Sequence, residues 1–341
     1  MGRRGARGRG TLVRPGRHIL VTGGAGFIGS HLVDRLLAEG QRVVVVDDLS
    51  TGRLENLAAH RREPRLEVKS QRVSACRTLP KLAREARLIF HLAAAVGVEL
   101  VVREPVRTME TNVLETEALL RAASAARAPV LLASTSEVYG KSRKAYFAEE
   151  DDLCIGPPHL GRWAYACSKL MDEFLALGHA RQHGLPVIIA RLFNTVGPRQ
   201  TGRYGMVLPR FVQAALEGQP LQVYGSGRQT RCFCHVRDTV EALWRLAHCP
   251  AAYGQVVNVG STREIRILDL ARLVKKLCHS ESPLVRVPYA QAYAPGFEDM
   301  QRRRPQIRRL VRLTGFRPRI PLERAIEELK EERGAARQAR G

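Results

Sequence analysis

The sequence Val21-Thr22-Gly23-Gly24-Ala25-Gly26-Phe27-Ile28-Gly29 joins a short apolar segment, residues 18–21, to a segment with helical periodicity, residues 27–39. Glycines allow the backbone to turn tightly and to approach a pyrophosphate closely. The N-terminus of the helix that follows offers free N–H groups and the positive end of its dipole. This stretch therefore predicts a phosphate-binding loop between a strand and a helix, with these candidate contacts: Gly23, Gly26, Phe27, Ile28 and Gly29.

The rest of the first half alternates between strand and helix patterns. Residues 43–46 are four consecutive valines, typical of a parallel strand buried on both faces. Further apolar strands are expected at residues 88–91, 130–133 and 187–190, with helices near residues 105–126 and 165–183. Such alternation predicts an α/β fold with a doubly wound parallel sheet, the Rossmann arrangement.

Glycine and proline become denser after residue 190, and short strands and helices mix irregularly. We therefore expect a smaller C-terminal α/β substrate lobe after the sheet domain. The expected divisions are a basic disordered tail at 1–16, a Rossmann domain at 17–190, the lobe at 191–334 and a tail at 335–341. Part of residues 232–262 is a candidate to pack back on the Rossmann sheet.

The chain carries a formal net charge of +22, concentrated at its ends. Residues 1–17 hold six Arg and no acid, and residues 301–341 hold thirteen Lys or Arg against five Glu. Basic ends of this kind are typical of solvated tails. Nucleic-acid binding is the alternative, but no recognition motif or aromatic interleaving supports it. A positive field would also attract a dianionic small molecule.

The seven cysteines are scattered, and their odd number in a long chain favours reduced thiols over a disulfide framework. Cys232-Phe233-Cys234-His235 hints at a metal site. A zinc site needs about four ligands, and no second cluster completes this one. A plain strand is the preferred interpretation, so no metal is expected.

No apolar run reaches the ~18–20 residues needed to cross a bilayer, and the basic N-terminus lacks an apolar signal-peptide core. Together with the reduced thiols, this predicts a cytoplasmic protein with no membrane contact.

Asp47 ends the valine run, about 20 residues past the glycine loop. In dinucleotide-binding sheets a carboxylate at this point bonds the adenosine ribose hydroxyls. It would also repel a 2′-phosphate. The loop and the carboxylate together predict NAD, rather than NADP, as the cofactor.

Tyr165 and Lys169 stand four residues apart, on one face of a predicted helix. A nearby ammonium stabilises a phenolate and lowers the tyrosine pKa toward neutrality, which would make Tyr165 a base for a sugar hydroxyl. A surface pair is the alternative. The preceding hydroxyl cluster, Ser134-Thr135-Ser136, favours the catalytic interpretation because one of its hydroxyls can hydrogen-bond the reacting oxygen.

These residues together resemble the extended short-chain dehydrogenase/reductases, the group of nucleotide-sugar epimerases, dehydratases and decarboxylases. The resemblance covers about residues 18–329, and the T-G-x-x-G-x-x-G motif of the family corresponds to Thr22–Gly29. It implies NAD as cofactor and a homodimer formed through the helices near 105–126 and 165–183. The cofactor contacts implied beyond the glycine loop are Asp47, Leu92, Ala93, Ala94, Asn112, Tyr165 and Lys169.

The second half resembles the family's substrate-binding segments. Asn194, within residues 191–199, is implied to face a nucleotide diphosphate. Tyr224 and Arg231 fall in a stretch similar to the nucleotide-binding loop, whose arginine binds diphosphate. One departure leaves the adenine contact open: relatives often carry Gly-Asp or Gly-Ser where this chain has Gln71-Arg72.

The stretch Thr135-Ser136-Glu137 resembles the UDP-glucuronate decarboxylases, whereas 4,6-dehydratases carry Thr-Asp-Glu there. Residues 161–165 resemble the P-R-W-x-Y of the same group, and residues 296–305 resemble its loop ending R-K-P. The arginine two before that proline, here Arg303, serves those enzymes as a catalytic acid or a carboxylate partner. The resemblance thus implies catalytic Thr135, Glu137, Tyr165, Lys169 and Arg303, and substrate contacts from Ser136 and Arg162.

The implied reaction oxidises C4 of UDP-glucuronate, which makes a ketone β to the C6 carboxylate and allows loss of CO₂. UDP-xylose or a UDP-4-keto-pentose would leave. Glu137 would repel the sugar carboxylate through its like charge or transfer a proton; the alternative is a structural carboxylate. Arg303 would orient the sugar carboxylate or protonate C5; the alternative is that its basic run is merely solvated. The alternatives are a UDP-sugar 4-epimerase of the UDP-glucose/UDP-galactose type, a 4,6-dehydratase, and a non-catalytic NAD-bound or RNA-associated protein.

Overall fold

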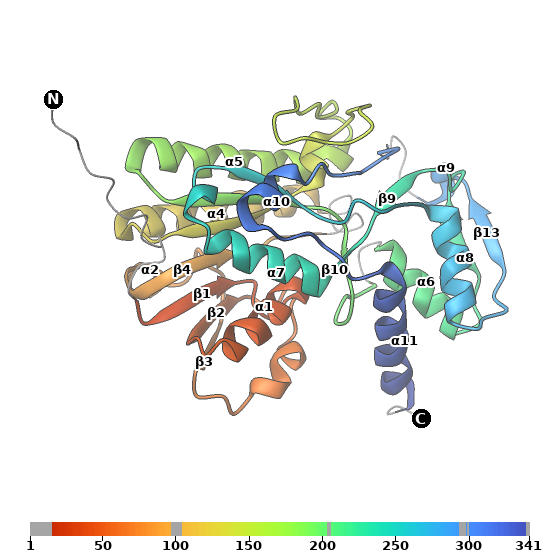
Figure 1. Ribbon diagram of the computed structural model, residues 1–341, viewed down its shortest axis with the longest axis horizontal. Helices are drawn as coiled ribbons and strands as arrows, with labels where there is room; N and C mark the ends of the chain where they lie inside the picture. The colour runs from red at the N-terminus through yellow and green to blue at the C-terminus, as the bar shows by residue number, and fades with distance from the viewer. Residues whose placement is uncertain (1–15, 97–103, 203–205, 293–297, 299, 339–341) are drawn as a thin grey trace.

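A seven-stranded parallel sheet forms the centre of the computed structural model (Figure 1), which describes residues 16–96, 104–202, 206–292, 298 and 300–338. The strand order is β11-β6-β5-β4-β1-β2-β3, and every neighbouring pair is parallel. Connections run outward from β1 to β3 and then cross back to β4, so the predicted doubly wound α/β fold is confirmed. The strands are β1 (His18–Thr22), β2 (Val43–Asp47), β3 (Leu66–Ser70), β4 (Ala86–His91), β5 (Val130–Thr135), β6 (Val187–Leu192) and β11 (Val256–Val259).

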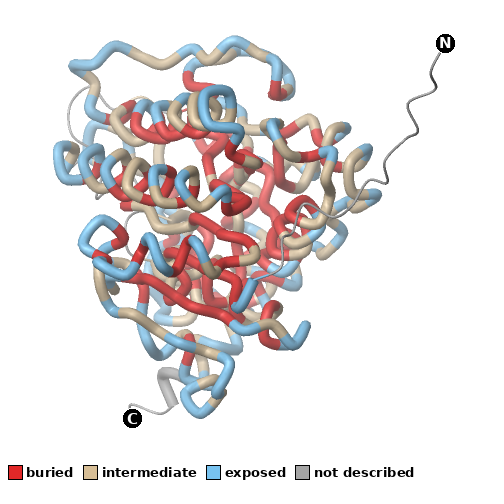
Figure 2. The backbone as a smooth tube through the Cα atoms, turned by 90° about the vertical axis from the view of Figure 1, so that its left-hand side faces the viewer, coloured by how far each residue is buried: buried red, intermediate tan, exposed pale blue. Residues whose placement is uncertain are grey.

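Helices cover both faces of this sheet, and the valine run shows why. Successive strand side chains point to opposite faces, so Val43 and Val45 enter one hydrophobic core while Val44 and Val46 enter the other. Figure 2 shows the buried backbone concentrated in the interior and exposed segments on the outside. On one face lie α1 (Phe27–Ala38), α7 (Val236–Ala247) and α10 (Arg308–Thr314); on the other lie α2 (Leu79–Glu85), α4 (Pro105–Ala126) and α5 (Ala164–His183).

A smaller α/β lobe with its own hydrophobic core stands beside the sheet (Figure 1). Its core is formed mainly by three helices, α6 (Val207–Leu216), α8 (Ile267–Leu277) and α11 (Leu322–Gln338). Its two short sheets pair β8 (Leu221–Tyr224) with β13 (Leu284–Val287) and β9 (Thr230–Cys232) with β12 (Glu264–Arg266). A third pair, β7 (Thr195–Val196) with β10 (Cys234–His235), lies where the chain passes from the sheet to the lobe and back.

The chain returns to the central sheet within residues 232–262. Strand β11 pairs with β6, joining Val256 to Ile189, and α7 packs against α1. Residues 1–15 and 339–341 of the two predicted tails lie outside the described residues, and α11 continues through Gln338. Within the described ranges, no helix combines the length and apolarity needed to cross a bilayer.

A long segment, residues 136–163, connects β5 to α5 and is here called the excursion. It packs on a fourth core that includes Tyr139, Phe147 and Met300. Phe147 forms a parallel bridge with Pro305, so the excursion and residues 300–307, here called the strap, are held together. The remaining short helices are η1 (Leu54–His60), η2 (Ser136–Tyr139), η3 (Gly161–Trp163), η5 (Pro250–Ala252) and α9 (Tyr289–Ala292).

Candidate active site

A cavity of about 390 Å³ lies at the carboxyl ends of the central strands and is lined by both lobes. This volume falls within the range of about 300–1,000 Å³ usual for ligand sites. Ligands of open α/β sheets bind at this edge, where the strand order reverses, here between β1 and β4. Every predicted site residue except Asn112 lines the cavity.

The glycine loop forms one wall, and its glycines are needed for close packing. Gly23 has φ +73°, and a Cβ there would lie 2.6 Å from the Ala93 nitrogen. A Cβ on Gly29 would lie 2.0 Å from the Gly23 carbonyl oxygen. Gly26 precedes α1, whose first turn has no acidic residue and no side-chain cap. The first amides of the helix are therefore suited to bind an anion.

Asp47 lies beside this loop at the end of β2. Its carboxylate accepts hydrogen bonds from the Ala25 and Leu49 amides, both at 2.9 Å. Burial raises the pKa of the Asp47 carboxyl, and these amide bonds oppose the rise. The carboxylate thus supports the loop as well as lining the cavity. Asp48 and Arg72 line the same region, with Arg72 Nε 3.8 Å from Asp48 Oδ2.

The segment after β4 forms the opposite wall through Leu92, Ala93 and Ala94. Asn112 does not reach the cavity: it is 1% exposed, its Oδ1 accepts from the Ala95 amide at 2.7 Å, and its Nδ2 donates to Ser168 Oγ at 3.0 Å. Asn112 therefore does not line the cavity as predicted but supports the wall from behind through these hydrogen bonds.

His91, to which the sequence assigned no separate role, also supports this wall. Its ring nitrogens lie 2.7 Å from Thr22 Oγ1 and 3.0 Å from Thr116 Oγ1. Burial lowers the pKa of His91 to about 3, so the ring is neutral near pH 7 and ties β1, β4 and α4 together.

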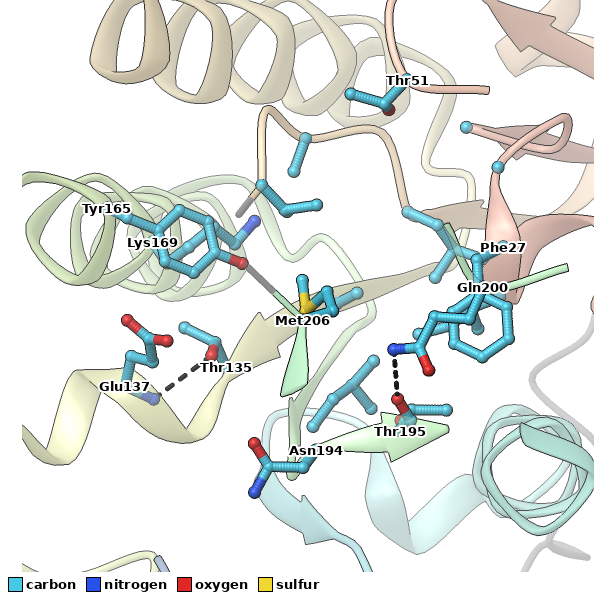
Figure 3. A pocket seen from close by; sticks show the side chains of 18 of the residues that line it. Phe27, Thr51, Thr135, Glu137, Tyr165, Lys169, Asn194, Thr195, Gln200 and Met206 are labelled. Carbon is cyan, nitrogen blue, oxygen red and sulfur yellow. Dashed lines mark hydrogen bonds between the residues drawn. The ribbon is translucent and has the colours of Figure 1, made fainter. Parts of the chain in front are cut away.

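Figure 3 shows Tyr165, Lys169, Thr135 and Glu137 grouped on one side of the cavity. Lys169 and Asp172 form a buried ion pair, with Lys169 Nζ 2.8 Å from Asp172 Oδ2. Burial raises the pKa of the Tyr165 phenol, the charges of Glu137 and Asp172 raise it further, and a hydrogen bond with Thr135 lowers it. The predicted lowering of this pKa was therefore wrong for the protein alone, because the sequence did not reveal how deeply the phenol is buried.

Glu137 lies between two arginines from distant parts of the chain. Arg162 Nη1 donates to one carboxylate oxygen at 2.5 Å and Arg303 Nη1 to the other at 3.1 Å. Burial would raise the pKa of the Glu137 carboxyl, but the two guanidinium groups lower it to about 2. We call these three residues the clamp. The clamp thus brings two guanidinium groups and one carboxylate together beside Tyr165.

The lobe side of the cavity holds the predicted substrate residues. Asn194 Nδ2 donates to the Cys232 carbonyl at 3.4 Å, and Arg231 Nη1 donates to the Thr230 carbonyl at 2.8 Å. The Arg210 guanidinium lies 3.9 Å from the centre of the Tyr224 ring. Sequence reasoning missed several lining residues of the lobe because no motif marks them: Met206, Arg210 and Tyr289.

The Cys-Phe-Cys-His stretch lies in and beside short strands. Burial raises the pKa of the Cys232 and Cys234 thiols to about 12, and His235 Nε2 lies 3.0 Å from Glu328 Oε2. Among the described residues, no group of three or more His, Cys, Asp and Glu side chains is arranged to hold a metal ion.

A dinucleotide-type sheet, a Tyr–Lys pair and a cavity shared by two lobes define the class of this protein as an extended short-chain dehydrogenase/reductase. Residues 19–260 match the NAD dependent epimerase/dehydratase family, and the chain belongs to that family. This membership confirms the class of cofactor predicted from the glycine loop and Asp47.

The curated relatives include decarboxylases. The chain is 39% identical to the UDP-N-acetyl-alpha-D-glucosaminuronate decarboxylase of Bacillus cytotoxicus, over 92% of this chain and 96% of that protein. It is 37% identical to UDP-glucuronic acid decarboxylase 1 of Danio rerio, over 92% of this chain and 71% of that one.

Solved structures with the same fold include epimerases. The UDP-glucuronic acid 4-epimerase of Bacillus cereus, in complex with UDP-glucuronic acid and NAD, superposes with a TM-score of 0.84 at 26% identity, over 93% of this chain and 99% of that one.

Proposed function

We propose that this protein is an NAD-dependent decarboxylase of UDP-glucuronate that releases UDP-xylose or a UDP-4-keto-pentose. The observation that carries the proposal is the clamp: Arg162 and Arg303 both donate to the Glu137 carboxylate beside Tyr165, so the site holds two guanidinium groups suited to a sugar carboxylate. The names of the curated relatives, decarboxylases of UDP-linked uronic acids, point the same way.

In this proposal the two lobes divide the ligands. Residues 17–190 bind NAD through the glycine loop, Asp47 and the wall at residues 92–94. Residues 191–334 bind the nucleotide-sugar, with Asn194 and Arg231 directed to the diphosphate and Tyr224 to the nucleoside. The fit to a dinucleotide rests on the uncapped first turn of α1 and the close packing of the loop glycines. NAD, when bound, would supply a positively charged ring that accepts a hydride, and would return the hydride only where UDP-xylose is the product.

Tyr165 removes the proton of the C4 hydroxyl, with Thr135 bonded to the phenol. Because burial and the nearby carboxylates raise the phenol pKa, the base form depends on nearby positive charge, and the Arg303 guanidinium lowers this pKa. The resulting C4 ketone lies β to the carboxylate, so the C5–C6 bond breaks, CO₂ leaves, and its bonding electrons enter an enolate.

The clamp residues act on the sugar carboxylate and the enolate. Since the Glu137 pKa is about 2, this carboxylate is ionised near pH 7 and is unsuited to donate a proton. Glu137 therefore holds Arg162 and Arg303 in place and disfavours a second negative charge beside it. Arg303 stabilises the enolate as CO₂ leaves, and C5 then takes up a proton from solvent to give the 4-keto-pentose.

We also propose a homodimer formed through α4 and α5, which lie side by side (Figure 1). Five of the eight exposed large hydrophobic side chains found among the described residues lie on these two helices: Val106, Met109, Leu114, Met171 and Phe174. Covering such a patch favours association. Phe174→Glu should convert a dimer to a monomer in sedimentation velocity; a wild-type monomer would contradict this.

A cytoplasmic location remains part of the proposal. All seven cysteines lie in the described ranges and are free thiols, which suits a reducing compartment. Fractionation of cells that express the full chain tests this expectation.

The deciding experiment is product analysis with NAD and a set of UDP-sugars. UDP-glucuronate should yield CO₂ together with a UDP-pentose seen by proton NMR. UDP-N-acetylglucosaminuronate serves as a parallel substrate, because one relative acts on it by name. Formation of UDP-galacturonate without CO₂, or interconversion of UDP-glucose and UDP-galactose, would establish a 4-epimerase instead.

A further inference from the structure

A buried amide behind the cavity joins the segments that carry the clamp. Asn258, on β11, is 0% exposed. Its Oδ1 accepts a hydrogen bond from the Tyr139 hydroxyl at 2.8 Å. Its Nδ2 donates to the backbone carbonyls of Phe147 at 2.9 Å and Gln306 at 3.3 Å. One side chain thus contacts two parts of the excursion, η2 and Phe147, and also the strap.

The bond to Tyr139 fixes the turn that carries Glu137. Tyr139 is the last residue of η2, two positions after Glu137, and is fully buried. Its ring stacks on Phe147 with centroids 4.8 Å apart, and the Arg191 guanidinium lies 4.8 Å from its ring centre. The Thr135 hydroxyl accepts from the Glu137 amide at 3.2 Å at the other end of the turn. Glu137 is therefore held from both sides.

The bonds to Phe147 and Gln306 fix the strap that carries Arg303. The Phe147 amide donates to the Arg304 carbonyl and the Gln306 amide donates to the Phe147 carbonyl, both at 2.8 Å. The Phe147 carbonyl thus accepts from Asn258 and from the strap together. Arg303 immediately precedes this paired stretch, so a shift of the strap would move its guanidinium relative to Glu137.

We propose that Asn258 is a positioning residue for decarboxylation, which sets the separation of Glu137 and Arg303 without touching the sugar. This inference rests on the proposed function. The two clamp residues are 166 positions apart in the chain, so no local turn fixes their distance. Only an amide of this size supplies one acceptor and two donors on adjacent atoms. Asn258 meets the hydroxyl with its acceptor and the two carbonyls with its donors.

The test replaces Asn258 with a group of the same shape, Asn258→Asp, which keeps the acceptor, loses the two donors and turns a carboxylate oxygen toward the Phe147 and Gln306 carbonyls. Misplacement of a reacting group by about 1 Å can cost about 100-fold in rate. Release of CO₂ from UDP-glucuronate should therefore fall by about 30- to 100-fold. The rate of oxidation at C4 depends on Tyr165 and should change by less than about threefold. Cofactor absorbance at 340 nm after rapid mixing measures this rate. Dissociation constants for NAD and UDP should stay within about twofold.

The matched control is Leu243→Ala, which opens a cavity in the core cluster shared by α7 and β11. A core truncation of this kind lowers the melting temperature without touching the clamp. If Asn258→Asp lowers oxidation and CO₂ release equally, or matches the control in both rates, the residue is merely structural and the inference fails.

A second variant keeps the inference testable if Asn258→Asp does not fold. Tyr139→Phe removes the hydroxyl bonded to Asn258 Oδ1, which also interacts with the Arg191 guanidinium. It should lower CO₂ release by about three- to tenfold with oxidation unchanged. Unchanged CO₂ release would overturn the inference. Wild-type protein that releases no CO₂ would instead overturn the proposed function, and the wild-type measurement alone reveals that outcome.

Discussion

The two ends of the cavity are built in different ways. At the glycine loop, the binding groups are mainly backbone amides within residues 21–29, supported by Asp47. At the clamp, Glu137, Arg162 and Arg303 come from three separate segments, and the binding groups are charged side chains. A site made of backbone amides is formed by consecutive residues, whereas a site made of side chains depends on how distant segments pack.

Substitutions at the two ends of the cavity should also have different effects on the protein. The loop has little free space, so an added atom displaces backbone. The clamp holds three charged groups with little exposure to water, and removing one of them disrupts the ion pairs of the others. Four substitutions test this comparison, from the largest expected effect to the smallest.

Tyr165→Phe lies between the two ends and should have the largest effect. Loss of a general base costs about 10²- to 10⁴-fold, so oxidation at C4 should fall by about 1,000-fold. The NAD dissociation constant should stay nearly constant, since the loop and Asp47 are untouched. Rapid mixing with UDP-glucuronate and a titration with NAD measure the two quantities. Retained oxidation would place the base elsewhere.

Glu137→Gln should lower CO₂ release by about 100-fold, because Arg162 and Arg303 lose the carboxylate that holds them. Oxidation at C4 should fall much less, which separates the clamp from the hydride-transfer end. Coupled assays of CO₂ and cofactor absorbance measure both rates. Equal losses in the two rates would mean that the cavity ends do not act separately.

The same variant gives a pH dependence whose sign follows from the lowered Glu137 pKa of about 2. The ionised carboxylate stabilises the folded protein fully above its unfolded pKa, near 4.5, and this stabilisation is lost as pH falls toward 2. The difference in free energy of unfolding between wild type and Glu137→Gln should be constant above about pH 5.5 and shrink below about pH 4.5. Urea unfolding at several pH values checks this; a difference that grows on acidification would contradict it.

Gly29→Ala should weaken NAD binding by about tenfold or more, because its Cβ would lie 2.0 Å from the Gly23 carbonyl oxygen. Gly178→Ala is the matched control, since a Cβ there meets nothing within 4 Å on helix α5. Calorimetric titration with NAD compares the two. Equal affinity in both variants would show that the loop tolerates movement, contrary to the packing described above.

Arg72→Ala should have the smallest effect, a two- to threefold change in NAD affinity. Its side chain is 52% exposed, and the contact with Asp48 is long, at 3.8 Å; exposed pairs of this kind contribute little. Titration with NAD and with ADP-ribose measures the effect. A change above tenfold in both would show that Arg72 contacts the adenosine directly.

The sequence predictions were also more complete for the glycine loop than for the clamp. The valine run and the glycine loop predicted the sheet, because strand periodicity and glycine spacing act between neighbouring residues. The sequence also predicted that Glu137 and Arg303 act at one site, but only through resemblance to the decarboxylases. Nothing in the spacing of Arg162 showed that it would share the Glu137 carboxylate.

Two predictions changed because they concern surroundings rather than residue types. The Tyr165 pKa is raised mainly because the fold buries the phenol, and the nearby Glu137 and Asp172 charges raise it further. Asn112 lies behind the cavity wall because its amide bonds the Ala95 backbone and Ser168. A motif gives the identity of a side chain, while the direction it faces depends on the elements packed around it.

The sequence by itself determined the sheet, the class of cofactor and the Tyr–Lys pair, since each depends on contacts within one strand, loop or helix. Only the tertiary structure decided the charge balance of the clamp and the place of Asn258 behind it. The physical reason is that electrostatic free energies depend on distance and burial, and these are set when segments more than a hundred residues apart come into contact.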